Sequence, residues 1–391
     1  MSYKYENEYL WDIPRTWNIG TEPMPLRPRI RDMPRKGCVD FEAIIGSEYG
    51  EKLVTNMRPY ILYEDEMGED LLAYLGEIGL KKELFETENL YTKWALYTPA
   101  SMYLPENKSK KYPLLFVNHG ACMPIYWEEN SGFLPIAARE EMIVISAQNH
   151  NEDNLMRILD IVCSKCAVDK SRIYCTGYSQ GGIQTIMCTL RHPEIFAAAA
   201  PCGSPFSLPD FMLPEDISAA PANRQLPCVI VCGQEESLEY FPANKDNLTL
   251  DTMGPDRHSQ STGDDPTLSK LFDSRAKVIP SQAIDKIAML NKKLRSIGHA
   301  EIPFDVCVAC KDSDSEVERK HGFPADRTET ITVLGVRHFI SYFSNGCGQE
   351  LLKVISIEGQ PHWPPATMAE LAWEFMRHFR RDTETKGLVV E

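Results

Sequence analysis

Residues 173–182 read IYCTGYSQGG, a short apolar run that ends in the pattern Gly-x-Ser-x-Gly, and a helical pattern follows. A strand, a tight turn and a helix in this order are typical of a nucleophile elbow, a strained bend that exposes a serine hydroxyl. Gly177 and Gly181 lack a Cβ, so the strand and the helix can approach closely beside Ser179. The N–H groups at the start of the helix, beginning with that of Gln180, suit an oxyanion.

Continuous apolar runs on either side of this stretch indicate strands that are covered on both faces. They are YPLLFVNHG (112–120), EMIVISAQNH (141–150), LPCVIVCGQEE (226–236) and ELLKVISIEG (350–359), preceded by the alternating LYTKWALYTPA (90–100). Helical patterns lie between some of them, as in EDNLMRILDIVCSKCA (152–167). This alternation predicts an α/β fold with a mostly parallel central sheet and helices on both faces.

The remaining segments suggest a domain organisation. Residues 1–87 are predicted to be an N-terminal extension, with Pro- and Arg-rich coil first and helical patterns such as 69–85 later. Residues 88–391 are the predicted catalytic domain. Within it, residues 242–280 are polar and rich in Asp, Ser, Gly and Pro, which predicts a long insertion that forms a loop or part of a cap over the site. An amphipathic helix is expected over 281–297, with Gly298 as its C-cap.

Composition excludes some classes of partner. The chain has 41 basic and 56 acidic residues, a formal net charge of −15, which argues against binding to nucleic acid or to an anionic membrane surface. The first twenty residues lack the pattern of a signal peptide, and no run approaches the roughly 18 apolar residues of a membrane span. We therefore expect a cytoplasmic protein.

Twelve cysteines include two Cys-x-x-Cys pairs, at 163/166 and 307/310. A four-cysteine zinc site would need such pairs on tight turns, but the first pair lies within a helical pattern. We expect reduced thiols, several of them buried in the core, and no metal site.

A serine nucleophile needs a base within hydrogen-bond reach and a carboxylate that orients the base. His362 lies in GQPHWPP, directly after the last apolar run and between prolines that can fix the loop, so it is the predicted base. Rival histidines after Ser179 are less well placed: they are His192, His258, His299, His321, His338 and His378.

The predicted acid is Glu236, which follows an apolar run three residues after Gly233. Glu235 is the next choice, and an acid within the insertion, Asp264 or Asp265, is the alternative. Because the acid only orients the imidazole and stabilises its charge, a Glu can replace the usual Asp.

Two backbone N–H groups should form the oxyanion hole, namely those of Gln180 and of Ala121, which follows His119-Gly120. His119 is expected to support the shape of this loop. Aromatic side chains next to these positions are candidates for substrate binding: they are Trp127, Tyr178 and Trp363.

These motifs together resemble the α/β-hydrolase superfamily, in particular its esterase branch with the polyhydroxybutyrate depolymerases and the feruloyl and acetylxylan esterases. The resemblance covers roughly residues 88–380, and VDKSRIYCTGYSQGG (168–182) is its most specific part. It implies a nucleophile at Ser179, a base at His362 and oxyanion donors at Gln180 and Ala121. The family usually has its acid in Gly-Thr-x-Asp, whereas this chain has Gly-Gln-Glu-Glu.

The resemblance implies a serine esterase that acts through an acyl-enzyme and without a metal or organic cofactor. Because we expect a cytoplasmic protein, the expected substrates are small soluble esters with short-chain acyl or hydroxycinnamoyl groups. The N-terminal extension is predicted to wrap a surface or to contact a second copy of the chain. One alternative is a peptidase of the prolyl-oligopeptidase type, although residues 1–87 are too few for that family's propeller. The other is a non-catalytic binding protein on a hydrolase fold.

Overall fold

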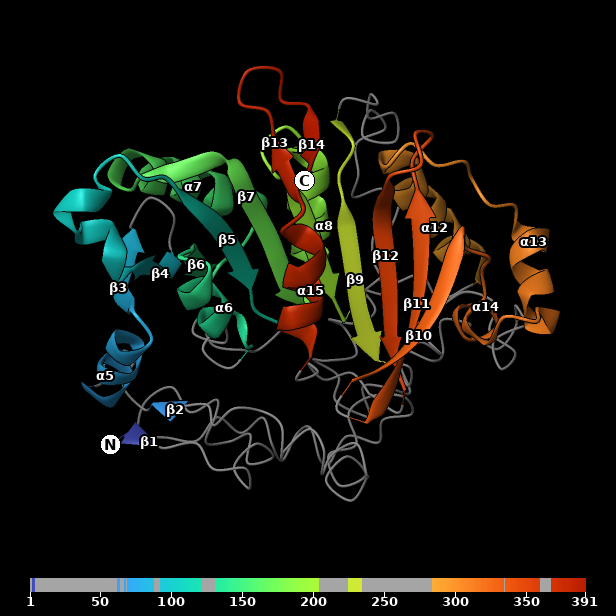
Figure 1. Ribbon diagram of the computed structural model, residues 1–391, viewed down its shortest axis with the longest axis horizontal. Helices are drawn as coiled ribbons and strands as arrows, with labels where there is room; N and C mark the ends of the chain where they lie inside the picture. The colour runs from blue at the N-terminus through green and yellow to red at the C-terminus, as the bar shows by residue number, and fades with distance from the viewer. Residues whose placement is uncertain are drawn as a thin grey trace, which may run out of the picture. The chain divides into compact units, whose positions relative to one another are not determined.

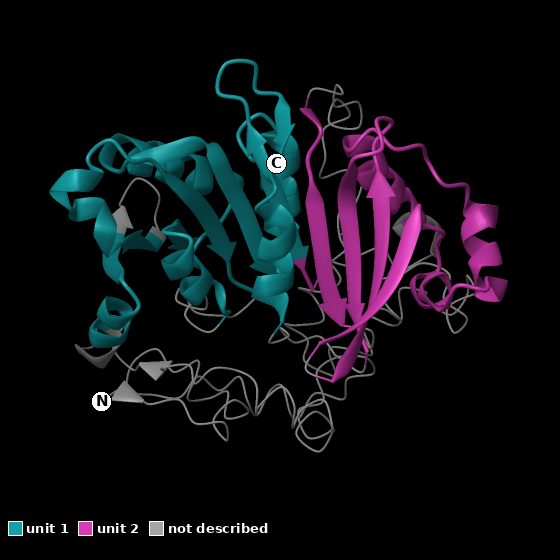
Figure 2. Cartoon of the chain, in the orientation of Figure 1, with its two compact units in different colours: residues 1–27, 54–201, 366–391 teal, residues 28–53, 202–365 magenta. Residues whose placement is uncertain are grey.

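The computed structural model describes residues 2–3, 62–63, 67, 69–87, 92–120, 131–203, 224–233, 283–333, 335–358 and 367–391. The chain divides into two compact units (Figure 2). The first consists of residues 1–27, 54–201 and 366–391, and the second consists of residues 28–53 and 202–365.

The sheet of the first unit has the strand order β8-β7-β5-β6-β4-β3. The strands β7 (Val168–Tyr178), β5 (Tyr112–Asn118) and β6 (Ile143–Ala147) run parallel, and β4 (Thr92–Pro99) and β3 (Leu80–Thr87) continue the sheet in antiparallel pairs. β5, β6 and β8 (Ala198–Cys202) are buried along their whole length. The predicted runs of continuous apolar residues are therefore central strands, as their composition indicated.

Helices cover both faces of this sheet (Figure 1). In that view α15 (Met368–Met376) lies in front of the strands and α8 (Gln180–Arg191) lies behind them. The unit also contains α6 (Phe133–Arg139) and α7 (Glu152–Lys165). The side chain of Asn151 caps α7 by accepting the N–H of Asn154 at 2.9 Å, and one stripe of α7 faces the core, as its helical pattern predicted.

The prediction of a helical segment over residues 69–85 is wrong in its second half. α5 (Glu69–Glu77) ends before Gly79, whose φ of 82° belongs to the left-handed region that terminates helices. β3 follows at once and pairs with β4, and the ring of Phe85 stacks on that of Trp94 with centroids 4.4 Å apart. The sheet of this unit thus begins within the segment predicted to be an extension.

Several short elements complete the first unit. β1 (Ser2–Tyr3) pairs with β2 (Leu62–Tyr63). The 3₁₀ turns η3 (Ala100–Tyr103) and η4 (Pro105–Asn107) connect β4 to β5.

A C-terminal hairpin packs against the strand that leads into the elbow. β13 (Phe379–Arg381) and β14 (Leu388–Val390) form the hairpin. The hydroxyl of Tyr174, on β7, donates to the carbonyl of Phe379 at 2.9 Å. The buried guanidinium of Arg381 donates to the carbonyl of Phe196 at 2.8 Å. The end of the chain therefore helps to bury β7.

The second unit has its own strands, in the order β10-β11-β12-β9. β9 (Cys228–Gly233) and β12 (Glu350–Ile357) are parallel, and β11 (Val336–Ser344) and β10 (Arg327–Val333) add antiparallel pairs. The helices are α12 (Ala283–Ser296), α13 (Phe304–Ala309) and α14 (Glu316–His321), and η10 (Cys310–Asp312) follows α13. Gly298 after α12 has a φ of 77°, which agrees with the predicted end of that helix.

One imidazole joins α14 to two strands of this unit. His321 is fully buried, and its Nδ1 lies 2.8 Å from the hydroxyl of Ser341 on β11. Its Nε2 lies 2.9 Å from the hydroxyl of Ser356 on β12. Because a neutral imidazole has one donor and one acceptor, and a hydroxyl can act as either, both contacts are satisfied without a charge. Burial lowers the pKa of His321 to about 3.

Candidate active site

Ser179 occupies a strained turn between β7, which ends at Tyr178, and α8, which begins at Gln180. Its backbone has φ 56° and ψ −114°. Residues other than glycine rarely adopt such a φ, and this backbone conformation costs about 1–3 kcal/mol of folding free energy. The Ser179 side chain is half-buried. The strand, turn and helix that the sequence predicted are confirmed, and the role of Ser179 as nucleophile remains a prediction.

The two glycines of the motif are required by close backbone contacts. A Cβ on Gly181 would lie 2.0 Å from the carbonyl oxygen of Asn118 at the end of β5. A Cβ on Gly177 would lie 2.5 Å from the carbonyl oxygen of Gly181 and 2.7 Å from that of Asn118. Real atoms do not approach so closely, so only glycine fits at either position. The end of β5, the end of β7 and the start of α8 therefore meet backbone to backbone.

The start of α8 provides the first predicted oxyanion donor. The first intrahelical bond runs from the N–H of Ile183 to the carbonyl of Ser179 at 3.1 Å. The N–H of Gln180 precedes this bond and has no acceptor within the helix, which is the general property of a first helical turn. It is thus placed next to Ser179 where the helix dipole also favours negative charge.

A pair of buried histidines supports the loop after β5. His119 Nδ1 lies 2.8 Å from the carbonyl oxygen of Gly120, and its Nε2 lies 3.1 Å from that of Gln148, which follows β6. The ring of His150 packs edge-to-face on that of His119, with centroids 4.5 Å apart. Burial lowers the pKa of His119, and burial and the neighbouring His119 lower that of His150 to about 4. Both rings are neutral at pH 7, so His119 has one N–H and donates to only one of these two carbonyls. The two rings pack at the ends of neighbouring strands.

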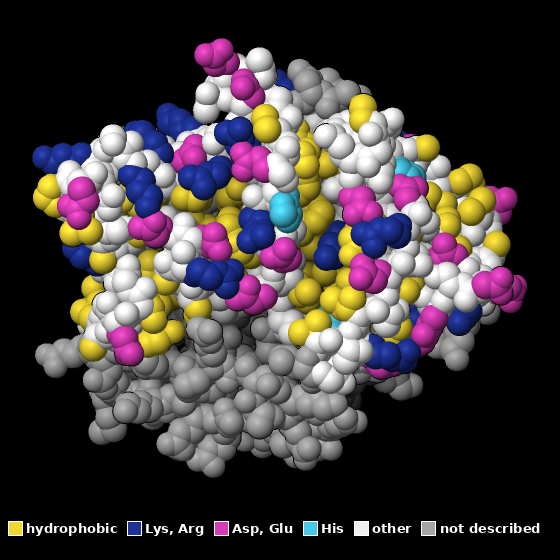
Figure 3. All heavy atoms as spheres, in the orientation of Figure 1, with side chains coloured by type: hydrophobic (Ala, Val, Ile, Leu, Met, Phe, Trp, Pro, Cys, Tyr) yellow, Lys and Arg dark blue, Asp and Glu magenta, His cyan; other side chains and the backbone are white. Residues whose placement is uncertain are grey.

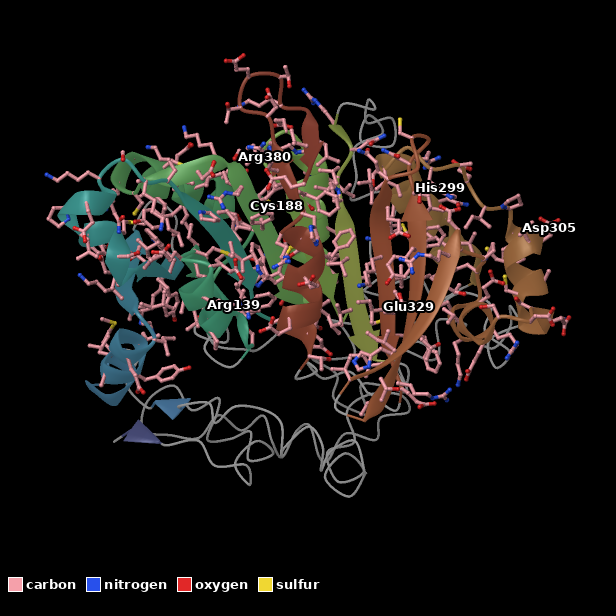
Figure 4. The ribbon with its side chains drawn as sticks, in the orientation of Figure 1. Arg139, Cys188, His299, Asp305, Glu329 and Arg380 are labelled. Carbon is pink, nitrogen blue, oxygen red and sulfur yellow. The ribbon has the colours of Figure 1, made fainter. Side chains whose placement is uncertain are left out.

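Rival histidines within the described residues have partners that suit structural roles: they are His192, His299, His321, His338 and His378. His192 Nε2 lies 2.9 Å from a carboxylate oxygen of Glu152. His299, which Figure 4 labels beyond the end of α12, contacts the Asp326 carboxylate through Nε2 at 3.2 Å and the Ala300 carbonyl through Nδ1.

Most of the other predicted site residues lie outside the described residues. They are the base His362, the acid Glu236 with its alternatives Glu235, Asp264 and Asp265, the donor residue Ala121, the aromatic residues Trp127 and Trp363, the rival His258 and the insertion 242–280. Their roles stay predictions. β9 does end at Gly233, so the acidic segment follows a strand as expected. The ring of Tyr178 is only 1% exposed, which favours packing, and its contact with substrate is a prediction.

The cysteines do not gather into a metal site in the described part of the chain, where no three His, Cys, Asp or Glu side chains are suitably close. Burial raises the pKa of Cys163 and of Cys166, and it raises that of Cys307 to about 12 and that of Cys310 to about 11. Thiols with raised pKa values are poor sources of the thiolate that zinc requires.

Sequence reasoning overlooked two residues of this region, Asn118 and His150. Asn118 is fully buried, and its amide Nδ2 donates to the hydroxyl of Thr185 on α8 at 3.1 Å. His150 follows β6 and packs on His119. Both come at or just after the end of a predicted apolar run, so a search for polar residues at the carboxyl ends of parallel strands would have found them.

A family model matches the part of the chain that contains the elbow. Residues 146–228 match the prolyl oligopeptidase family, and this segment contains the last two residues of β6 and all of α7, β7, the elbow, α8 and β8. The chain has the α/β-hydrolase fold. The family match covers the elbow and stops before the predicted acid and base. A comparison with curated proteins gave no match.

Similar solved structures include hydrolases of several kinds. An acetyl xylan esterase from Aspergillus awamori is 11% identical with a TM-score of 0.41, and the aligned part covers 76% of this chain and 99% of that one. Poly(aspartic acid) hydrolase-1 from Sphingomonas sp. KT-1 is 11% identical with a TM-score of 0.39, over 76% and 98%. A ferulic acid esterase is 18% identical with a TM-score of 0.33, over 39% and 78%. All three similarities are distant and partial.

No helix among the described residues is both long enough and apolar enough to cross a membrane.

Proposed function

We propose that this protein is a serine hydrolase that cleaves carboxylic esters of small soluble substrates, with Ser179 as the nucleophile. The observation that carries the proposal is the conformation of Ser179, whose φ of 56° is maintained between β7 and the start of α8. A strained serine followed by a helix N-terminus has the arrangement that acyl transfer needs. A serine in an ordinary turn would have no reason to retain this strain.

In the proposed reaction the Ser179 hydroxyl attacks the ester carbonyl while His362 accepts its proton. The N–H groups of Gln180 and Ala121 stabilise the oxyanion of the tetrahedral intermediate. His362 then donates the proton to the leaving alcohol, and an acyl-enzyme remains. Water, deprotonated by His362, releases the acid and regenerates Ser179. Glu236 orients His362 and stabilises the imidazolium.

The proposed substrates are esters with short-chain acyl or hydroxycinnamoyl groups, and we propose that the protein meets them in the cytoplasm. The resemblance of the sequence motifs to feruloyl and acetylxylan esterases supports this choice. Aromatic residues next to the predicted catalytic positions, Trp127 and Trp363, suit flat acyl groups. The net charge of −15 favours neutral substrates over polyanions.

The test compares wild type with Ser179→Ala on p-nitrophenyl esters of increasing acyl length and on a hydroxycinnamoyl ester. We expect the variant to fold like wild type and to lower turnover by about 10³-fold or more, because no neighbouring group can replace the nucleophile. A fluorophosphonate should label wild type at Ser179 and should not label the variant. Substantial ester hydrolysis by Ser179→Ala would rule out the mechanism.

A serine peptidase is the second candidate, because residues 146–228 match the prolyl oligopeptidase family. The matched segment ends before Glu236 and His362 and includes the elbow that esterases also use. A proline p-nitroanilide assayed beside a p-nitrophenyl ester separates the two activities. Faster cleavage of the anilide at equal concentrations would favour the peptidase.

A further inference from the structure

A buried polar cluster lies directly beneath the nucleophile elbow. The hydroxyl of Thr185, one turn into α8, donates to the carbonyl of Gly181 at 2.8 Å. It accepts the amide N–H of Asn118 at 3.1 Å and contacts the thiol of Cys175 at 3.6 Å. The side chains of Asn118, Cys175 and Thr185 are all 0% exposed. A hydroxyl has one proton and two lone pairs, so this arrangement uses its whole bonding capacity.

These contacts join the end of β5 to α8, the helix whose first residue, Gln180, carries a proposed oxyanion donor. Asn118 is the last residue of β5, two positions before Gly120, and Thr185 lies on the helix that begins at Gln180. The carbonyl of Asn118 also touches the backbone at Gly181. That backbone contact only prevents a closer approach. The hydrogen bond from Asn118 to Thr185 keeps the end of β5 from moving away from α8. The two contacts together define the distance between the end of β5 and the first turn of α8.

The cluster is not arranged for maximal stability. The Oδ1 atom of Asn118 is buried and has no hydrogen-bond partner among the described residues. An unsatisfied buried acceptor costs about 1–3 kcal/mol. An apolar side chain of similar size would avoid this cost. The main contribution of the amide is therefore the hydrogen bond that its N–H donates to Thr185.

We propose that Asn118 and Thr185 are positioning residues for ester hydrolysis: their hydrogen bond holds the end of β5 at a fixed distance from the first turn of α8, where the proposed donor Gln180 lies. The inference rests on the proposed function. An oxyanion donor acts only within about 2.7–3.1 Å of the developing charge, and displacements near 1 Å can cost about 100-fold in rate. Neither residue touches the substrate.

The experiment compares Thr185→Val with Thr189→Val. Thr189 is equally buried on α8, and its hydroxyl donates to the carbonyl of Thr185 at 2.7 Å. Thr189→Val therefore removes the same kind of hydrogen bond within the helix as Thr185→Val does, but it removes no hydrogen bond to β5. We expect Thr185→Val to lower kcat on p-nitrophenyl acetate about tenfold with KM within about twofold of wild type. Thr189→Val should keep kcat within about twofold of wild type. Thr185→Ser, which retains the hydroxyl, should restore kcat. Equal kcat for the two valine variants overturns the inference.

A second variant keeps the inference testable if Thr185→Val does not fold. Asn118→Ala breaks the same hydrogen bond from the strand side and also removes the unsatisfied oxygen. Its kcat should fall about tenfold, and the double variant should fall no further than either single variant, because both remove one interaction. Additive losses overturn the coupling.

The rate of fluorophosphonate labelling at Ser179 separates the inference from the proposed function. If wild type labels but hydrolyses no ester, the proposed substrate class is wrong, and the ratio of labelling rates for Thr185→Val and Thr189→Val still decides the inference. If wild type neither labels nor hydrolyses, Ser179 is not a nucleophile and both proposals fail. Unfolding in urea, measured for every variant, identifies losses of activity that come from unfolding.

Discussion

At the scale of single residues, three positions define the elbow, and two different physical causes act on them. Ser179 has a backbone conformation that its side chain disfavours, whereas Gly177 and Gly181 have ordinary φ values and are required by neighbouring carbonyls. Both causes depend on a few residues close in sequence. For this reason Gly-x-Ser-x-Gly after an apolar run is sufficient to predict the turn.

A glycine substitution tests the backbone contact. Gly181→Ala should lower the free energy of unfolding by about 3 kcal/mol or more, because its Cβ would lie 2.0 Å from a backbone oxygen that cannot move freely. Gly76→Ala is the matched control. Gly76 lies on α5 with nothing within 4 Å of the place that an added methyl group would take, so alanine should stabilise by up to about 1 kcal/mol. Urea denaturation measures both, and a similar small change in the two variants would contradict the contact.

The site residues that are harder to predict are those that act through tertiary contacts. Nothing in the sequence near Asn118 indicates that its amide reaches Thr185, 67 positions later. The pairing of His119 with His150 likewise depends on the adjacency of β5 and β6. The sequence identifies the polar residues at strand ends, but their partners follow from the strand order.

At the scale of secondary-structure elements, prediction succeeds where burial is continuous and fails where the pattern is ambiguous. The runs that form β5, β6, β7, β9 and β12 are rich in Val, Ile and Leu, which favour strands covered on both faces. β8 was not predicted, because its sequence AAAPC has little β propensity. It forms a strand because it is buried in the sheet, and burial outweighs propensity. β3 is mistaken for helix, because its apolar and charged residues fit either period.

For the predicted acid and base, the sequence gives the position along the chain but not the conformation of the loop. Both are predicted to follow strands, Glu236 after β9 and His362 after β12, and those strands are parallel neighbours. Strand order therefore gives the edge of the sheet at which each segment begins. The choice among Glu235, Glu236 and a residue of the insertion depends on loop conformation, which a propensity pattern does not contain.

A short helix of the second unit provides an element-scale prediction. α14 has six residues, too few to be stable alone, and His321 ties it to β11 and β12. His321→Ala should lower the free energy of unfolding by about 3 kcal/mol, since it leaves a cavity and two buried hydroxyls with a lost partner. His378→Ala, at an exposed position after α15, should change it by less than about 0.5 kcal/mol. Equal effects in urea denaturation would show that the His321 contacts contribute nothing.

At the scale of the whole molecule, buried neutral histidines make stability depend on pH. Burial lowers the pKa of His150 to about 4 and that of His321 to about 3, and it also lowers those of His119 and His338. In the unfolded chain a histidine titrates near a pKa of about 6.5. Below that pH the unfolded chain binds more protons than the folded one, so stability is lost as the pH falls from about 6.5 towards 4.

The expected loss between pH 7 and pH 4.5 is roughly 2–3 kcal/mol from each of His150 and His321. Urea denaturation at a series of pH values at constant ionic strength measures it. In His321→Ala the free energy of unfolding should fall less between pH 7 and pH 4.5 than in wild type, by the roughly 2–3 kcal/mol that His321 contributes. This holds even though the variant is less stable at pH 7. A free energy of unfolding that stays constant from about pH 7 to about pH 4.5 would contradict the burial of these rings.

Charges of both signs are mixed on one face of the described residues. Lys and Arg side chains alternate with Asp and Glu on the face that Figure 3 shows. Ion pairs such as Arg139 with Glu370 join neighbouring elements there, and pairs as exposed as this one add little to stability. The net charge of −15 therefore acts mainly through solubility and through its effect on charged partners.

The hairpin that packs on β7 has a consequence for synthesis of the protein on the ribosome. The Tyr174 hydroxyl bonds a carbonyl 205 positions later, and Arg381 reaches back 185 positions to Phe196. A nascent chain that has just emerged to residue 200 already contains the whole elbow, yet it leaves one side of its central strand uncovered. Translation must reach residues 379–390 before that side is covered, so we expect the elbow region to complete its folding only after the hairpin has been synthesised.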